Sequence, residues 1–431
     1  MHSFCYRDGH LYCEEVDLAH IAAEVGTPTY VYSAGTILDH YARLNTALRS
    51  LDHLICYAVK ANSNRAILKL LADAGAAFDI VSGGELYRVL ASGGDAAKCT
   101  FAGVGKSREE IEYALKERVY SFNVESEAEL EHIDRIAGAK ETRAPIALRV
   151  NPVDRIAATY ERAAKMRNVE IVGLQMHIGS QITEATPFAN AIERVAPIVR
   201  ELQSKYGIKF FSVGGGMGIV YRFALESGSG KWWHDHGGES SAFSVRDYAE
   251  AIMAPLRQLR VRVLVEPGRF LVGNAGVLLI RVRYIKKSGA KKFAIVDGGM
   301  NDLIRPALYQ SYHEIVPVIE PSTSDKVGRD HRARQGIRED SSTSMSNSRE
   351  KIDVVGPVCE SGDFFALDRE MPELHEGDLL AIMSAGAYGF SMASNYNSRP
   401  LPAEALVRGN KFALIRKRQT WEDLVAGEID P

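Results

Sequence analysis

Eight strand-like segments alternate with helix-like segments through the first two thirds of the chain. The strand-like runs are apolar or β-branched and span residues 54–60, 77–81, 99–104, 119–124, 145–151, 171–179, 208–214 and 261–267. The intervening stretches have helical periodicity, weakest over 152–170, and the patterns SREE and SEAE are typical of capped helix starts. Alternating strands and helices form a parallel sheet, and eight repeats predict a (β/α)8 TIM-type barrel over residues 34–277.

The pattern changes after about residue 277. Residues 277–299 read as two strands around a Ser-Gly turn, and further strand-like runs cover 313–320, 351–361, 377–386 and 403–418 with few helical stretches between them. This spacing predicts an antiparallel β domain over residues 278–431. Residues 320–350 are polar and rich in Ser and Arg, which favours a flexible insertion in that domain.

Composition excludes several classes of function. Net charge is −3 with acids and bases well mixed, so no basic face indicates binding to nucleic acid or to a membrane surface. No apolar run approaches the roughly 20 residues that span a bilayer, and the N-terminus carries no signal-peptide pattern. The five cysteines include no CxxC pair, which fits a reducing cytoplasm without disulfides or structural zinc. His234 and His236 lie in a predicted loop over 222–245 that we interpret as surface, so we expect no metal site.

Polar residues recur where the predicted barrel strands end, which is where barrel enzymes place their active sites. Lys60 ends the first strand, His177 lies near the end of the sixth, and Glu266 and Arg269 lie at the end of the eighth. A lysine partly desolvated there is expected to have a lowered pKa and can form a Schiff base. Taken singly, each residue also fits an ordinary role, such as a lysine that reaches from a strand end to solvent.

Three consecutive glycines, Gly214, Gly215 and Gly216, follow the seventh strand and form a candidate phosphate loop, although such a run taken alone more often marks a sharp turn. Glu266 is a candidate partner for the ring nitrogen of pyridoxal phosphate (PLP), because a protonated ring is the better electron sink. His177 could stack on a flat cofactor or serve only as a core histidine.

The predicted β domain carries a second set of candidates. Arg305 and Tyr309 lie four residues apart and would share one face of a helical turn. Arg305 and Arg269 together could hold a carboxylate. Cys359 is a candidate proton donor in a loop, and Tyr388 a phenol that could contact phosphate or substrate.

These motifs appear in order as YAVKAN, VSGGEL, MHIGSQ, VGGGMGI, EPGR, MNDLIRPALY, GPVCESGDFF and GAYGFSMASNYNSRP. Together they resemble the diaminopimelate decarboxylase family, within the alanine-racemase-like fold group of PLP enzymes, over about residues 5 to 425. The resemblance implies that residues 1–33 join the C-terminal β domain. It also implies decarboxylation of meso-2,6-diaminopimelate to L-lysine and CO2, the last step of lysine biosynthesis.

The resemblance also assigns roles to individual residues. It implies that Lys60 holds PLP as a Schiff base, that Cys359 protonates the substrate carbon, and that two copies form a homodimer with the Cys359-Glu360-Ser361 loop supplied across the interface. The implied cofactor-binding residues are Lys60, His177, Gly214, Gly215, Gly216, Glu266, Pro267, Gly268, Arg269 and Tyr388. The implied substrate-binding residues are Arg269, Arg305, Tyr309, Glu360, Ser361 and Tyr388.

Two features depart from the family pattern. Ser212 stands where an acidic residue is more usual, and the 320–350 insertion is longer than the usual link, although neither removes a site residue. Three other functions remain open: a PLP decarboxylase for carboxynorspermidine, arginine, ornithine or a D-amino acid, a homologue without activity, and a PLP racemase. The arginine pair favours a substrate with a second carboxylate, because a buried arginine without a partner is costly.

Overall fold

The chain divides into two compact units, which are described separately. The computed structural model describes residues 2–150, 156–230, 232, 244–320 and 349–429. The first unit comprises Met1–His2, Ser33–Gly276 and Ser384–Ser391, and the second comprises Ser3–Tyr32, Val277–Met383 and Met392–Pro431. This division differs from the expected one mainly in Ser384–Ser391, which groups with the barrel rather than with the β domain.

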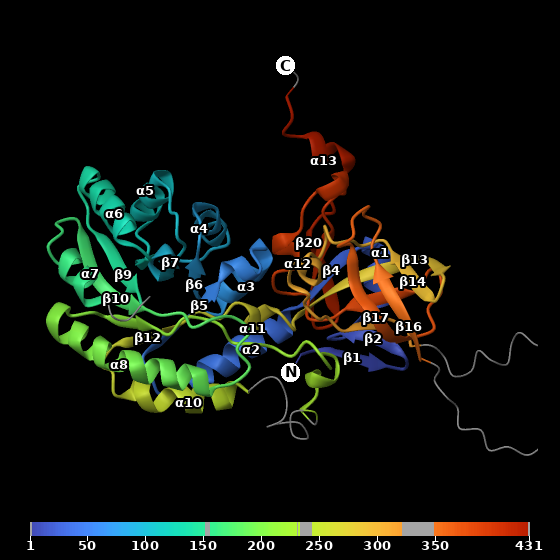
Figure 1. Ribbon diagram of the computed structural model, residues 1–431, viewed down its shortest axis with the longest axis horizontal. Helices are drawn as coiled ribbons and strands as arrows, with labels where there is room; N and C mark the ends of the chain where they lie inside the picture. The colour runs from blue at the N-terminus through green and yellow to red at the C-terminus, as the bar shows by residue number, and fades with distance from the viewer. Residues whose placement is uncertain (1, 151–155, 231, 233–243, 321–348, 430–431) are drawn as a thin grey trace, which may run out of the picture. The chain divides into compact units, whose positions relative to one another are not determined.

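The first unit is a closed parallel barrel, as predicted from the eight repeats (Figure 1). Its strands follow one another around the barrel in chain order, and the last, β12, pairs with the first, β5. Their bounds are β5 (His53–Ala58), β6 (Ala77–Ile80), β7 (Cys99–Phe101), β8 (Ser121–Val124), β9 (Ala144–Arg149), β10 (Val169–Gln175), β11 (Phe210–Ser212) and β12 (Arg262–Val265). Each strand falls within or beside its predicted segment.

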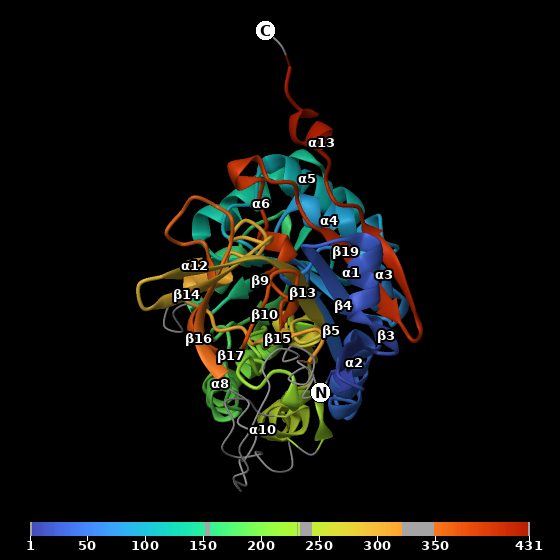
Figure 2. The same cartoon turned by 90° about the vertical axis from the view of Figure 1, so that its right-hand side faces the viewer.

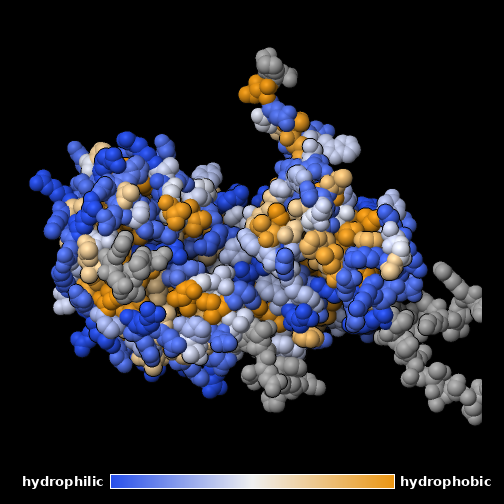
Figure 3. All heavy atoms as spheres, viewed as in Figure 1, coloured by the Kyte–Doolittle hydropathy of each residue, from blue (hydrophilic) through white to orange (hydrophobic). Residues whose placement is uncertain are grey.

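One helix, α2 (Ala34–Ala47), precedes the first barrel strand, and the other helices lie after the barrel strands. They are α3 (Arg65–Asp73), α4 (Gly83–Leu90), α5 (Arg108–Glu117), α6 (Glu127–Ala139), α7 (Ile156–Ala163), α8 (Thr186–Tyr206), α10 (Val245–Arg257) and α11 (Arg269–Val272). Ser107 and Ser126 cap α5 and α6, as the SREE and SEAE patterns predict. Helices α8 and α10 lie side by side (Figures 1 and 2). The face in Figure 3 is mainly hydrophilic over the outer helices, with scattered apolar patches.

The barrel interior is filled by apolar side chains from opposite strands. One cluster of buried residues comprises Cys56, Ala77, Ala147, Val172, Phe210 and Leu264. Gly173 of β10 belongs to this packing, because a Cβ there would collide with the Phe210 ring. The barrel is therefore a packed core, and its chemistry has to lie at the strand ends.

The second unit contains two sheets. The small one joins β1 (Phe4–Arg7), β2 (His10–Cys13) and β3 (Val16–Asp17). Among the described residues the large one has nine strands: β4 (Thr29–Ser33), β13 (Gly276–Ser288), β14 (Lys291–Val296), β15 (Ile315–Pro317), β16 (Arg349–Val355), β17 (Phe364–Pro372), β18 (Leu379–Ile382), β19 (Ala403–Arg408) and β20 (Lys411–Arg416). The pairs β13–β14, β13–β18, β15–β18, β16–β17 and β19–β20 are antiparallel, as predicted, whereas β14 and β16 pair in parallel, so the sheet is mixed. The described residues of this unit also form the α-helices α1 (Leu18–Val25), α12 (Arg305–Tyr309) and α13 (Trp421–Val425).

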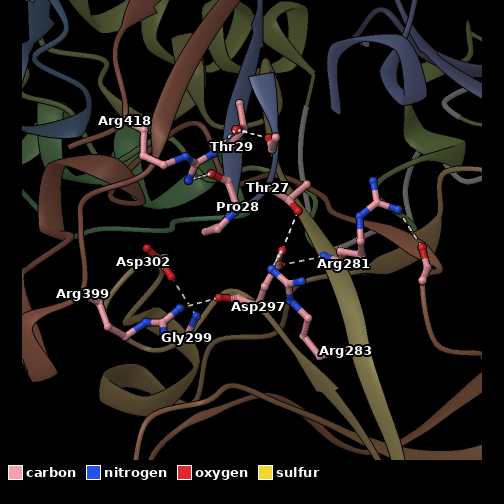
Figure 4. Close-up of polar contacts among 12 residues, drawn as sticks. Thr27, Pro28, Thr29, Arg281, Arg283, Asp297, Gly299, Asp302, Arg399 and Arg418 are labelled. Atoms are coloured by element: carbon pink, nitrogen blue, oxygen red, sulfur yellow. Dashed lines mark hydrogen bonds and ion pairs between the residues drawn. The ribbon is translucent and has the colours of Figure 1, made fainter. Parts of the chain in front are cut away.

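The N-terminal segment joins the second unit, as the resemblance implies. Strand β4 lies between β13 and β19 in the large sheet. Asp297, just after β14, binds this segment to the large sheet (Figure 4). Its carboxylate accepts hydrogen bonds from the Thr27 hydroxyl at 2.5 Å and from the Arg281 amide at 2.8 Å. The Arg399 guanidinium donates to the Asp297 carbonyl oxygen at 2.5 Å. Residues from four parts of the chain thus meet at the buried residue Asp297.

Some expectations fall outside the described residues. The described residues do not include most of the 320–350 insertion, His234 or His236. In the described ranges, no group of three or more His, Cys, Asp or Glu side chains could hold a metal ion. Over the same ranges, none of the helices combines the length and the apolar character needed to cross a membrane.

Candidate active site

Lys60 lies just beyond the end of β5, in a short 3-10 turn over Val59–Ala61. Its ammonium nitrogen is 3.7 Å from a carboxylate oxygen of Asp79, at the end of the neighbouring strand β6. Asp79 is the main reason why the pKa of Lys60 is raised above its ordinary value, and it outweighs the opposing effect of desolvation. The expectation of a lowered lysine pKa was therefore wrong for the chain by itself.

Asp79 is a buried carboxylate that the sequence reasoning missed. Its side chain is 2% exposed, and burial raises its pKa despite the nearby ammonium of Lys60. An acid in the middle of an apolar strand, AFDIV, was the available signal, because such a residue requires a partner when it is buried. The structure supplies that partner as Lys60.

Glu266 directly follows β12 and is buried. Its carboxylate accepts a hydrogen bond from the Ser212 hydroxyl at 2.6 Å and another from the Gln175 amide at 3.1 Å. The pKa of Glu266 is raised to about 7, first by burial and then by the negative charge of Asp79. Lys60, Asp79 and Glu266 therefore interact electrostatically at the same end of the barrel.

The three glycines follow β11 and pass close to neighbouring backbone. Gly214 and Gly216 have φ of +74° and +101°, which favour glycine. A Cβ at Gly214 would clash with the Met176 carbonyl oxygen, and one at Gly215 with the carbonyl oxygen of Glu266. Only glycine fits this path, and the resulting bare backbone is suited to approach by an anion.

Pro267 and Gly268 place the EPGR segment against the strand that carries Lys60. The Ala58 amide donates to the Pro267 carbonyl oxygen at 3.1 Å. A Cβ at Gly268 would lie 3.1 Å from the Cβ atoms of Ala58 and Ala61. These two residues therefore hold the backbone that follows Glu266 close to the end of β5.

His177 follows β10 and is half-buried. Burial is the main cause that lowers its pKa to about 4, and the positive charges of Arg149 and Lys60 act in the same direction. Its ring is therefore neutral at physiological pH. A neutral imidazole offers a flat face for stacking against an aromatic ligand.

Arg269 begins α11 and is surrounded by aromatic and hydroxyl groups of the first unit. It donates to the Tyr221 hydroxyl at 2.5 Å and to the Ser180 hydroxyl at 3.2 Å. Its guanidinium carbon lies 5.0 Å from the centre of the Tyr388 ring. Its Nε is buried without a hydrogen-bond partner among the described residues. Such a nitrogen is available to an incoming acceptor.

Tyr388 lies in the segment Ser384–Ser391, which groups with the barrel. Its backbone has φ of +56°, and its amide donates to the Ala61 carbonyl oxygen at 2.8 Å, next to Lys60. Burial raises the pKa of its phenol, which stays protonated at neutral pH. The structure thus brings Lys60, His177, Gly214–Gly216, Glu266–Arg269 and Tyr388 into one unit.

The other predicted residues belong to the second unit. Helix α12 carries Arg305, which is buried and donates to the Ser311 hydroxyl at 3.2 Å, and Tyr309, which is 60% exposed. They are four residues apart on a helical turn, as predicted, but they differ in exposure. Cys359, Glu360 and Ser361 occupy an exposed loop between β16 and β17.

Asp363 shapes that loop, and the sequence reasoning passed over it within the CESGD motif. Its two carboxylate oxygens accept hydrogen bonds from the amides of Met300, at 2.6 Å, and Val358, at 2.5 Å. The same loop approaches α12, because a Cβ at Gly362 would lie 3.5 Å from the Ala307 side chain. The Cys359 loop and α12 are therefore neighbours within the second unit.

The residues at the barrel end suit PLP. Lys60 supplies an amine for an aldehyde, the glycine loop carries no side chains where it passes the neighbouring backbone, and buried Glu266 can face a ring nitrogen. Two buried polar atoms, Arg269 Nε and Gln175 Oε1, have no hydrogen-bond partner among the described residues. The glycine loop, the amine of Lys60 and the carboxyl group of Glu266 all lie at the same end of one barrel.

Comparison with known proteins identifies the same family as the sequence motifs do. The model for "Pyridoxal-dependent decarboxylase, C-terminal sheet domain" matches residues 29–386. Diaminopimelate decarboxylase of Pseudomonas aeruginosa is 44% identical, with 99% of both chains covered, and that of Vibrio cholerae is 41% identical, with 98% of this chain and 97% of the relative covered.

Solved structures agree. Diaminopimelate decarboxylase of M. jannaschii has a TM-score of 0.86 at 32% identity, covering all of this chain and 98% of the other. The Helicobacter pylori enzyme complexed with L-lysine has a TM-score of 0.82 at 36% identity, covering 95% and 98%. The chain therefore belongs to the pyridoxal-dependent decarboxylases, as a member of the diaminopimelate decarboxylase family.

Proposed function

We propose that this protein decarboxylates meso-2,6-diaminopimelate to L-lysine and CO2 with PLP as cofactor. The observation that carries the proposal is the arrangement around Lys60, whose ammonium lies 3.7 Å from buried Asp79 at the barrel end that also carries Glu266. Family relatives with this name, one of them complexed with L-lysine, support the choice of substrate and product.

Each site residue of the first unit has a proposed role toward the cofactor. Lys60 would bind its aldehyde carbon and Glu266 its ring nitrogen, while His177 would cover one face of the ring. The Gly214–Gly216 backbone would hold the phosphate, with support from Pro267, Gly268 and Tyr388. When bound, PLP supplies an electron sink for the bonding pair that the departing CO2 leaves on the substrate carbon.

The residues of the second unit have proposed roles toward the substrate. The Cys359 thiol would deliver a proton to the carbon that has lost CO2, which replaces the broken C–C bond with a C–H bond. Arg305 and Tyr309 would bind the carboxylate that is retained, as would Arg269 of the barrel. Glu360, with Ser361, would face the distal amino group.

We further propose that two copies form a homodimer in which the Cys359-Glu360-Ser361 loop of one copy completes the site of the other. The exposed apolar side chains of Leu308 and Tyr309, 53% and 60% exposed on α12 beside this loop, support an interface on this part of the second unit. We place the protein in the cytoplasm, where its free cysteines would remain reduced.

The test is CO2 release by the purified protein with PLP, with meso-diaminopimelate offered beside ornithine, arginine and lysine. Release from diaminopimelate alone, with lysine as product, is the expected result. Release from ornithine or arginine instead would keep the lysine chemistry and overturn the roles of Arg269 and Arg305. Lys60→Ala is expected to abolish both turnover and the absorbance of the lysine-bound cofactor, whereas continued CO2 release would overturn its role.

A further inference from the structure

The Ser212 hydroxyl connects two parts of the barrel end that are also joined by a backbone hydrogen bond, from the Glu266 amide to the Gly214 carbonyl oxygen at 2.9 Å. Ser212 ends β11 and is fully buried. Its oxygen accepts a hydrogen bond from the Gly214 amide at 3.2 Å and donates one to a Glu266 carboxylate oxygen at 2.6 Å. One hydroxyl therefore bridges the first glycine of the loop and the buried acid.

The strand register places this bridge. In the parallel sheet Ser212 is level with Gln175 on β10 and with Leu264 on β12, two residues before Glu266. Gln175 donates to the other carboxylate oxygen of Glu266 at 3.1 Å. Each oxygen of the carboxylate thus has its own donor, one from β11 and one from β10. A carboxylate held at both oxygens has little freedom to rotate.

We propose that Ser212 is a positioning residue that locks the Glu266 carboxylate to the glycine loop, so that the acid facing the cofactor ring and the cradle for its phosphate keep one fixed geometry. This inference rests on the proposed PLP site. Gln175, which donates to the other carboxylate oxygen of Glu266, has the same positioning role. A serine suits this role because a hydroxyl can accept from the loop and donate to the acid at the same time, whereas an acidic residue at this position would place a second negative charge against Glu266.

The charge around Glu266 supports this role for an uncharged donor. Burial and then the charge of Asp79 raise the pKa of Glu266, whereas the hydrogen bonds from Ser212 and Gln175 and the charge of Lys60 lower it. The buried thiol of Cys56 and the buried phenol of Tyr248 also interact with this carboxylate, and their own pKa values are raised. Loss of the Ser212 hydroxyl would remove a stabiliser of the ionised acid, so Glu266 would remain protonated to higher pH.

The test compares Ser212→Ala with Ser212→Thr, which keeps the hydroxyl, and with Ser121→Ala as a matched control. Ser121 is a fully buried serine of barrel strand β8 whose hydroxyl donates to Asn123 at 3.4 Å. The first readout is the infrared band of the protonated Glu266 carboxyl in the apoprotein as a function of pH, identified by its loss in Glu266→Gln. The second is PLP affinity from a fluorescence titration. Circular dichroism confirms that each variant is folded.

In Ser212→Ala the carboxyl band is expected to persist to higher pH, and PLP affinity to fall about tenfold, as for the loss of a hydrogen bond to a charged group. Ser212→Thr should restore both readouts toward the wild-type values, and Ser121→Ala should leave both unchanged. If either readout of folded Ser212→Ala equals that of the wild type, the inference is wrong. A wild-type protein that binds PLP but releases no CO2 from diaminopimelate would overturn the proposed substrate and leave this inference intact.

Discussion

The ammonium of Lys60 lies 3.7 Å from the carboxylate of Asp79, and the two residues come from adjacent ends of the parallel strands β5 and β6. The pair explains why a lysine at the end of an apolar strand keeps a raised pKa although it is partly desolvated. A protonated lysine is a poor nucleophile, because attack on an aldehyde requires the neutral amine. Asp79 therefore opposes capture of the cofactor until Lys60 loses its proton.

Asp79→Asn tests this relationship. Loss of the carboxylate removes the main cause that raises the lysine pKa, so the neutral amine should appear at lower pH. We expect the pH profile for the rate of PLP capture by the apoprotein to shift to lower pH, as measured by stopped-flow absorbance. Asp73→Asn is the matched control, because Asp73 also pairs with a lysine, Lys69, but on the exposed surface of α3. An unchanged profile in Asp79→Asn would contradict the prediction.

Glu266 should make the stability of the apoprotein depend on pH. Its pKa rises from 4.5 to about 7 on folding because of burial, so the folded state favours the protonated form. The resulting stabilisation is fully present below about pH 4.5 and is lost as the pH rises through about 7, a change of about 3 kcal/mol. Glu266→Gln cannot ionise at this position and should lack the effect.

Urea unfolding of the two apoproteins measures the difference. The free energy of unfolding of the wild type should fall relative to that of Glu266→Gln as the pH rises from acidic to slightly alkaline values. Glu250→Gln, at a 62% exposed side chain paired with Arg246 on α10, provides the comparison for a surface glutamate. A constant difference between wild type and Glu266→Gln across this pH range would show that the carboxyl is not buried in the protonated form.

The barrel was predictable because its signals are local. Each strand is a short apolar run bounded by turn residues, and the residues at the strand ends, from Lys60 to Glu266, share one barrel end once parallel pairing is assumed. The glycine loop was predictable for the same reason. The backbone there passes so close to its neighbours that Gly214 and Gly215 have to be glycine, and the sequence shows this as a run of glycines. The barrel and the glycine loop depend on the order of the segments along the chain rather than on the exact register between paired strands.

Other features of the fold and the site depend on which distant residues become neighbours in the folded chain. A local stretch of sequence does not specify those neighbours. The raised pKa of Lys60 arises from Asp79, 19 residues away along the chain, and requires the β5–β6 register. The clamp on Glu266 requires Gln175 and Ser212 from two further strands. The parallel pairing of β14 with β16 likewise follows from tertiary connections that a strand pattern leaves open.

Arg269→Lys should weaken binding of a substrate that carries a second carboxylate. The arginine guanidinium is oriented by Tyr221 and Ser180 and keeps a buried Nε without a partner among the described residues, whereas a lysine cannot offer the same planar donors. We expect KM for meso-diaminopimelate to rise about 10- to 100-fold, with a smaller change in kcat. Steady-state CO2 release measures both constants. Arg43→Lys, at an arginine paired with Asp39 on α2, serves as the control, and an equal KM in the two variants would refute the assigned role.

Cys359→Ala should slow turnover while leaving PLP bound. The thiol lies in an exposed loop of the second unit, and its proposed task is to deliver a proton after CO2 has left. Loss of a general acid typically costs about 10²- to 10⁴-fold in rate, so kcat should fall by an amount in this range. Turnover is followed by CO2 release, and cofactor content by absorbance. Cys5→Ala removes another exposed free thiol and should retain wild-type turnover. If Cys359→Ala decarboxylates as fast as Cys5→Ala does, the proton at the substrate carbon comes from another group.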